Sequence, residues 1–229
     1  SYGFDLSLGK TKKEVEDNWI LSRMENMSEV FNRSMQRYEV HTAYRALEHF
    51  IVEDLSRWYV KLIRDRLWIE GEDATKISAY ITLHRVLMKV IRFLAPATPH
   101  ICERIYKGLD GPLPSVHMCD WPTDDPTLIR PELEEHMKII QEIVEATANA
   151  RQKANINLRW PVKRIVIKAE DERVVSAVNS IRDILLQQTN AKKVEIIEPG
   201  ETWEEMSWDV KPNLHAIGPC LLYTSPSPR

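Results

Sequence analysis

Apolar residues recur every three or four positions through the first half of the chain, a spacing that places them on one face of an α-helix. The longest run of this kind ends at the polar sequence EGED, residues 70–73. Its apolar positions are Val40, Tyr44, Leu47, Ile51, Leu55, Trp58 and Leu62. Similar spacing elsewhere predicts further helices joined by short loops, and such an arrangement makes a bundle. The bundle is expected to contain four helices, at about 13–38, 40–67, 74–94 and 99–108.

The pattern changes in the second half of the chain. Pro131, in an acid-rich first turn, favours the start of another long helix over about 131–153. Two short apolar runs then flank an amphipathic stretch, and this alternation predicts a strand, a helix and a strand. These three elements are expected within 163–169, 171–189 and 192–199, with a candidate third strand within 203–215. The prediction is a mainly α-helical bundle followed by a small α+β subdomain.

These changes of pattern divide the chain into four parts. The helical bundle is expected over 1–125, and a long connecting helix with a basic junction over 126–160. The small α+β subdomain follows over 161–219. The last residues, 220–229, are rich in serine and proline and lack periodicity, so they are expected to be a disordered tail.

Composition indicates a globular protein that buries a core. The chain has 229 residues, of which 43% are hydrophobic and 28% charged. No apolar run approaches the roughly 18 residues of a membrane-spanning helix, and the first residues lack the pattern of a signal peptide. The three cysteines, Cys102, Cys119 and Cys220, are widely spaced and do not form a disulfide framework. We therefore expect a cytoplasmic protein without membrane association.

Residue patterns typical of catalysis or cofactor binding are missing. The seven glycines form neither a phosphate-binding loop nor a dinucleotide fingerprint. No set of acid, base and nucleophile can be named. Two His-x-Cys pairs, His100 with Cys102 and His117 with Cys119, do not have the spacing that zinc favours, since residues two apart on a helix point to different faces. We expect no catalytic residue, no cofactor and no metal in this chain.

A cationic face is predicted near the end of the helix at 40–67. Its members are Arg57, Lys61, Arg64 and Trp68. They are spaced by four, three and four residues, so they share a face away from the apolar stripe. Such a face suits an RNA backbone, and Trp68 is available to stack on a base. The alternative is an ordinary charged helix surface, on which Glu53 or Asp65 pairs with these cations.

The sequence ARQKANINLRWPVKRI, residues 150–165, lies in a cationic stretch that has no acidic residue from 151 to 168. The cations suit phosphates, the amides Asn155 and Asn157 suit base edges, and Trp160 offers an aromatic plane. Together these ingredients indicate single-stranded RNA. The cationic candidates are Arg151, Lys153, Arg159, Lys163 and Arg164. The alternative is architectural: Trp160 and Pro161 pack the corner where helix gives way to strand, and burial is expected for Trp160.

Six stretches, read together and in this order, resemble the C-terminal region of class I isoleucyl-tRNA synthetases of the archaeal and eukaryotic-like kind. They are DNWILSRM (17–24), VEDLSRWYVKLIRDRLW (52–68), LAPATPHICERIY (94–106), SVHMCDWP (115–122), ARQKANINLRWPVKRIVI (150–167) and VKPNLHAIGP (210–219). The resemblance covers about residues 15–219. The earlier stretches are loosely shared with valyl, leucyl and methionyl enzymes, whereas LRWP and VKPN…GP favour isoleucine. The tail at 220–229 matches nothing in the family.

The resemblance implies a function as well as a fold. The bundle would bind the anticodon arm of tRNA(Ile), with Arg66 joining Arg57, Lys61 and Arg64 on phosphates and the junction cations approaching from the other side. Its other implied partner is the catalytic domain of the same polypeptide, and the protein would be a monomer. The complete enzyme would use ATP and Mg²⁺, with Zn²⁺ as a further candidate. Its catalytic and editing domains would precede Ser1, so this chain alone is expected to be inactive.

Two alternatives stay open at this level. The chain could be the corresponding region of a valyl- or leucyl-tRNA synthetase, which would bind a different tRNA through the same kind of surface. It could also be a helical protein-interaction module without RNA binding, in which case the basic stretch is incidental.

Overall fold

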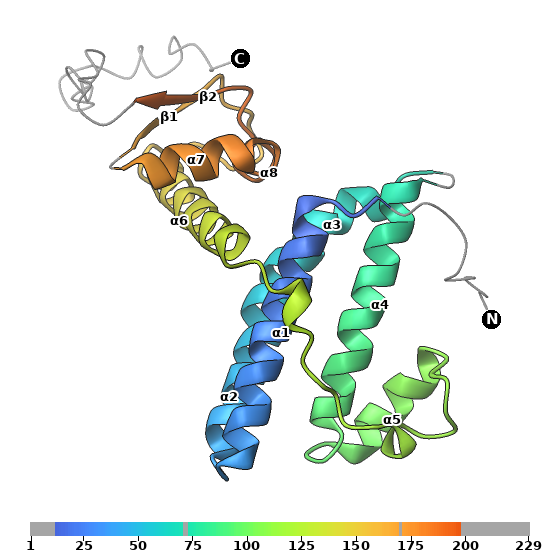
Figure 1. Cartoon of the computed structure of the whole chain (residues 1–229). Coiled ribbons are helices and arrows are strands. Elements are labelled where there is room, and N and C mark those ends of the chain that lie inside the picture. Colours follow the sequence, from blue (N-terminus) through green and yellow to red (C-terminus); the bar gives the residue numbers. More distant parts are fainter. Residues whose placement is uncertain (1–11, 71–72, 170, 198–229) are drawn as a thin grey trace, which may run out of the picture.

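The computed structural model describes residues 12–70, 73–169 and 171–197. Long helices run side by side as a bundle, and a short helix lies at one end of it (Figure 1). The bundle elements are α1 (Val15–Gln36), α2 (Val40–His49), η1 (Phe50–Tyr59), α3 (Val60–Leu67), α4 (Ala74–Leu94) and α5 (Pro99–Gly108). Two single 3₁₀ turns, η2 (Val116–Met118) and η3 (Pro126–Leu128), follow in the loop that leaves the bundle. The four predicted bundle helices are confirmed, with ends shifted by at most two residues.

The predicted helix over 40–67 is one continuous helical run, but its central segment, η1, is a π-helix. Leu47, Leu55, Tyr59 and Ile63 are buried along it, and their separations are multiples of four. An α-helix has 3.6 residues per turn, so a repeat of four drifts around the helix. The wider turn of a π-helix corrects this drift and keeps the buried side chains facing the core.

Aromatic side chains from different helices meet in the bundle core. The ring of Phe31 on α1 lies 4.6 Å from that of Phe93 on α4 and 5.3 Å from that of Tyr44 on α2, measured between centroids. Trp19 and Leu47 are also buried in this core. The apolar periodicity of the sequence therefore corresponds to the faces that pack together.

The second part of the molecule is carried by α6 (Pro131–Lys153), which has Pro131 in its first turn as predicted. Glu134 fixes the start of α6 against α1, because its carboxylate accepts hydrogen bonds from Ser22, from Arg23 at 3.0 Å and from Asn26 at 2.5 Å. Beyond this point α6 leads away from the bundle (Figure 1).

The end of α6 packs against a β-α-β unit. Its strands β1 (Ile165–Lys168) and β2 (Val194–Ile197) are parallel, with Ile165 opposite Val194. Between them lie α7 (Glu172–Ser180) and α8 (Arg182–Thr189). A single helix was the prediction for this stretch, but Ile181 leaves helical geometry at φ −125° and divides it. The predicted class, a mainly α-helical bundle with a small α+β part, is confirmed.

Some expectations fall on residues that the structure does not describe. The candidate third strand within 203–215, the tail at 220–229 and Cys220 all lie outside the described ranges. Among the helices that are described, none combines the length and apolarity needed to cross a membrane.

Candidate nucleic-acid interface

The cationic face predicted on the long helical run is present. Arg57, Lys61, Arg64 and Trp68 are all exposed, and Trp68 retains 81% of its accessible surface. Arg57 pairs with Glu53 at 2.8 Å, as the alternative reading expects. The side chains of Lys61 and Arg64 make no hydrogen bond or ion pair with any residue in the described ranges. Two exposed charges without protein partners, beside an exposed aromatic ring, suit a phosphate backbone with an unstacked base.

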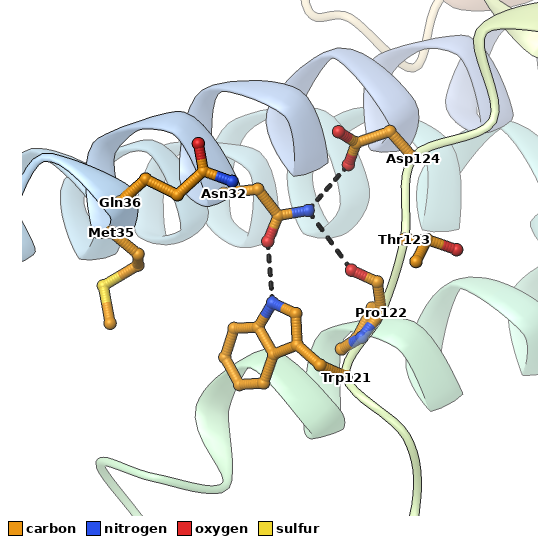
Figure 2. Close-up of a pocket in the computed structure, with 7 residues that line it drawn as sticks. All are labelled: Asn32, Met35, Gln36, Trp121, Pro122, Thr123 and Asp124. Carbon is orange, nitrogen blue, oxygen red and sulfur yellow. Dashed lines mark hydrogen bonds between the residues drawn. The ribbon is translucent and has the colours of Figure 1, made fainter.

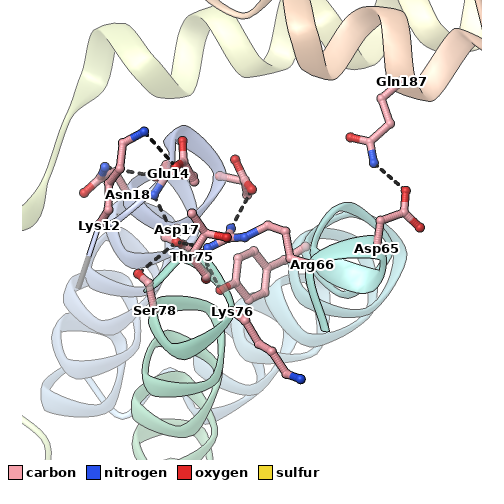
Figure 3. A network of polar contacts seen from close by, with 12 residues as sticks. Lys12, Glu14, Asp17, Asn18, Asp65, Arg66, Thr75, Lys76, Ser78 and Gln187 are labelled. Atoms are coloured by element: carbon pink, nitrogen blue, oxygen red, sulfur yellow. Dashed lines mark hydrogen bonds and ion pairs between the residues drawn. The ribbon is translucent and has the colours of Figure 1, made fainter. Parts of the chain in front are cut away.

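Arg66, from the same run, does not belong to this surface, which corrects the expectation that it contacts phosphate. Its side chain is only 13% exposed and points into the bundle (Figure 3). The guanidinium donates to Asp17 at 2.8 and 3.1 Å, to Glu16 at 2.6 Å and to the carbonyl of Thr75. Because these bonds engage both terminal nitrogens in the interior, Arg66 joins α1 to the first turn of α4.

The surroundings of Arg66 are a buried polar network. The Tyr59 hydroxyl donates to Asp17 at 2.8 Å, and Ser78 donates to the same carboxylate at 3.2 Å. Burial raises the pKa of the Tyr59 hydroxyl, and the neighbouring Asp17 charge adds to this effect. Burial also raises the pKa of the Glu16 carboxyl, although the Arg66 charge acts in the opposite direction. These groups hold the helices together and engage both terminal nitrogens of Arg66, whose remaining donor, Nε, is buried away from the surface.

Arg151 is likewise turned inward, which corrects its assignment as an RNA contact. It is 5% exposed, and its guanidinium donates to the carbonyls of Thr189 at 2.8 Å, Asn157 at 2.7 Å and Trp160. Arg151 therefore ties the end of α6 to the end of α8 and to the turn between them.

The remaining cations of the junction face outward. Lys153, Arg159 and Lys163 are exposed, and none has a side-chain partner among the residues that the structure describes. Arg164 is exposed as well, but it lies 3.3 Å from Glu195 on β2. Residues 151–168 contain no acid, so an ion pair at Arg164 was not expected from the sequence. The acid comes from the neighbouring strand, β2.

Trp160 corrects another expectation, because the architectural reading predicts that it is buried. It is 52% exposed, and its neighbour Leu158 is 57% exposed. Asn155 and Asn157 are exposed too. Asn155 adopts a left-handed backbone at φ 55°, and the Asn157 side chain accepts from the backbone N–H of Arg159 at 3.0 Å. The amide of Asn157 thus shapes its own turn.

One hydrogen bond links the β-α-β unit to the end of the bundle. Gln187 of α8 donates to Asp65 of α3 at 2.8 Å (Figure 3). Asp65 follows Arg64 directly, and Gln187 lies one helical turn before Asn190, which binds the junction turn. The last turn of α8 therefore contacts α3, and the residue that ends α8 contacts the junction turn.

A surface hollow of about 580 Å³ lies elsewhere, between α1 and the loop before α6 (Figure 2). Asn32 bridges it by accepting from the Trp121 indole at 2.7 Å and donating to Asp124 at 2.8 Å and to the Pro122 carbonyl at 3.2 Å. The lining side chains of Asn32, Trp121 and Asp124 bind one another, and no cation lines the hollow, so it does not suit a nucleic acid. The described ranges also contain no cluster of His, Cys, Asp or Glu that could hold a metal.

Comparison with known proteins connects this geometry to a family. A family model described as the anticodon-binding domain of tRNA ligase matches residues 17–167, more than half of the chain. The chain belongs to this family. The matched region of the anticodon-binding domain includes the α3 face and all of the junction cations, and it ends within β1.

Individual curated relatives show which kind of tRNA ligase the chain is similar to. The chain is 44% identical over 216 residues to the isoleucine–tRNA ligase of Methanocella arvoryzae, and 48% identical over 207 residues to that of Pyrococcus abyssi. These alignments cover 92% and 89% of this chain but only 20% and 19% of the relatives. The chain therefore spans about a fifth of the length of these ligases.

Sequence reasoning missed three residues that shape this anticodon-binding domain. Asn190, Gln187 and Asp65 organise the junction and dock it on α3, and two of them lie beyond the family match. Asn190 carried one readable signal, since asparagine after a helix favours the left-handed conformation that it adopts here at φ 51°. The contact between Gln187 and Asp65, 122 positions apart, has no local signature.

Proposed function

We propose that this chain is the tRNA-binding part of an isoleucine–tRNA ligase and that its two cationic surfaces hold the anticodon arm of tRNA(Ile). The observation that carries the proposal is the set of exposed cations without side-chain partners among the described residues: Lys61, Arg64, Lys153, Arg159 and Lys163. Arg66 and Arg151 are bound within the protein, so among the predicted contact residues these five have their full charge available to a polyanion. Arg57 and Arg164 lie at its margins and keep part of their charge for the protein's own acids.

The proposed cations position the RNA, and other side chains select its sequence. Contacts to phosphate fix register and orientation without reading bases. Base selection in single-stranded RNA uses stacking on aromatic planes and amide contacts to base edges. Trp68 and Trp160 are the exposed aromatic rings beside the cations, and Asn155 and Asn157 are the exposed amides. These four side chains would meet the unpaired nucleotides of the anticodon loop.

The rest of the activity would come from other parts of the polypeptide. We propose that a catalytic domain joined to this one uses ATP and Mg²⁺ to charge tRNA(Ile) with isoleucine, in the cytoplasm and as a monomer. The support is that the relatives are isoleucine–tRNA ligases about five times longer than the matched region.

Titration of the chain with tRNA(Ile) tests the proposal. Fluorescence anisotropy should show an affinity that falls as salt rises from about 50 to about 200 mM, because bound cations release counterions from the RNA. Five phosphate contacts correspond to a log–log slope between about −3.5 and −4.5. The isolated anticodon stem-loop should compete with the whole tRNA.

Two competitors separate the alternatives. If tRNA(Val) or tRNA(Leu) displaces tRNA(Ile) at equal concentration, the isoleucine assignment loses its support. If binding to every tRNA is absent or insensitive to salt, the phosphate-binding surface is wrong and a protein-interaction module becomes the better reading.

A further inference from the structure

In the turn at residues 157–160 the backbone carbonyls bind the protein, while the side chains face solvent. All four of its carbonyls accept hydrogen bonds from two buried or anchoring side chains. Arg151 donates to the carbonyls of Asn157, at 2.7 Å, and Trp160. Asn190 donates to those of Leu158, at 3.3 Å, and Arg159, at 3.0 Å. The backbone of the turn is therefore bound on its inner side along its whole length.

The side chains of the same turn face solvent. Leu158, Arg159 and Trp160 are exposed, the first and last by more than half. Leu158 and Trp160 are large apolar side chains two positions apart, and burial of their exposed surface by a ligand would be favourable. The inward hydrogen bonds of the backbone account for this exposure, because the turn cannot rotate its side chains inward while its carbonyls are held.

Arg151 and Asn190, the two residues that anchor the turn, are each held in place by their surroundings. Arg151 is buried, and no carboxylate among the described residues pairs with it. Its charge is compensated by carbonyls, one of which belongs to Thr189 in the last turn of α8, the negative end of that helix. Asn190 occupies the left-handed position that ends α8. From this position its side chain reaches the carbonyls of the turn.

We propose that Arg151 and Asn190 are positioning residues for RNA recognition: they hold the 157–160 turn so that Trp160 and Arg159 meet an unpaired base and its phosphate. This inference rests on the proposed function. The anchors themselves touch no RNA. Gln187, one turn before Asn190, binds Asp65 and so connects the helix that anchors the turn to α3.

The proposal is tested with Arg151→Lys, Asn190→Gly and Trp160→Ala in the full chain. Arg151→Lys keeps the charge but lacks the planar fork that reaches several carbonyls. Asn190→Gly keeps the left-handed backbone and changes no charge. Each of the two anchor variants should weaken tRNA(Ile) binding about tenfold. A tenfold loss is the equivalent of one charge-assisted hydrogen bond between the turn and the RNA. Arg45→Lys on the exposed surface of α2, outside the proposed interface, is the matched control and should bind like the wild type.

A double-mutant cycle distinguishes positioning from a general loss of stability. Trp160→Ala should weaken binding markedly in the wild-type chain and much less in the Arg151→Lys or Asn190→Gly chain, because the ring is already misplaced there. Strictly additive losses, or wild-type affinity in both anchor variants, would overturn the proposal.

Hydrogen–deuterium exchange gives a readout that needs no RNA. The backbone N–H of Trp160 donates within the turn, to the carbonyl of Asn157 at 3.0 Å. Peptides covering 155–162 should exchange faster in both anchor variants, while peptides from α4 stay unchanged. Unchanged protection of the turn would refute the anchoring role even if the wild-type chain bound no tRNA. Absence of salt-dependent binding by the wild type would instead refute the proposed function.

Discussion

Arg66 and Arg151 lie at equivalent places in the two cationic segments, near the end of a long helical run, yet they are stabilised by different chemistry. Arg66 is enclosed by the carboxylates of Asp17 and Glu16, whereas Arg151 is enclosed by carbonyls. In both segments the buried member is an arginine, and lysines are found only outside. The guanidinium fork satisfies several acceptors at once, which an ammonium on a flexible chain cannot do with the same geometry. A cationic stretch thus divides into residues that fold it and residues that remain for a ligand.

The difference in partners makes the two arginines unequal for stability. Removing Arg66 would leave the carboxylate of Asp17, whose side chain is fully buried, without a counter-charge. Removing Arg151 would leave neutral carbonyls without a donor. An unpaired buried charge costs several times more than an unpaired carbonyl.

The largest expected effect follows from this inequality. Arg66→Met should lower the free energy of unfolding by about 3–5 kcal/mol, the usual consequence of breaking a buried ion pair. Arg151→Met should lower it by about 1–3 kcal/mol. Urea unfolding followed by far-UV circular dichroism measures both. Arg57→Met, which breaks only the exposed pair with Glu53, is the control and should cost less than about 1 kcal/mol. Equal costs for Arg66 and Arg151 would contradict the distinction between the two kinds of partner.

The same pair of residues shows what the sequence could and could not predict. Helices, strands and the cationic segments follow from local spacing, and they are present in the described ranges, with the predicted helix at 171–189 divided into α7 and α8. The inward turn of Arg66 depends on Asp17, which is 49 positions away, and that of Arg151 on Thr189, 38 positions away. Local periodicity carries no information about such contacts. Family resemblance supplied the expected function but placed both arginines on the RNA.

The exposure of Trp160 was missed for a related physical reason. A tryptophan beside a proline at a helix–strand corner normally packs inward, since burial of its ring is favourable. Here the carbonyls of the turn occupy the inner side, and the ring is left outside. The outcome depends on Asn190, which follows it by thirty positions and carries no signal that links it to the turn.

The outward-facing residues provide the next test of the comparison. Lys61→Ala and Arg64→Ala should each change the free energy of unfolding by less than about 0.5 kcal/mol, because neither side chain has a partner in the described part of the protein. Each should reduce the log–log salt slope of tRNA binding by about 0.7–0.9, the loss of one phosphate contact. Arg57→Ala, whose charge is shared with Glu53, should reduce the slope by less. A larger effect on folding than on binding would assign these residues to the protein's own structure.

The smallest expected effect concerns the pH dependence of stability. The acceptors around Arg66 include titratable carboxylates, whereas those around Arg151 are backbone carbonyls. Burial raises the pKa of Glu16 above its ordinary value of 4.5, so the folded state binds this proton more tightly than the unfolded state does. The stabilising contribution is present below pH 4.5 and is lost as pH rises through the higher folded-state pKa. Glu16→Gln removes this titration. The free energy of unfolding of the variant, relative to the wild type, should therefore increase with pH across that window, as measured by urea unfolding at a series of pH values. In contrast, the cost of Arg151→Met should stay constant through the same range, since its partners are carbonyls. A cost that varies with pH at Arg151 would mean that an ionisable group, and not the backbone alone, holds the junction turn.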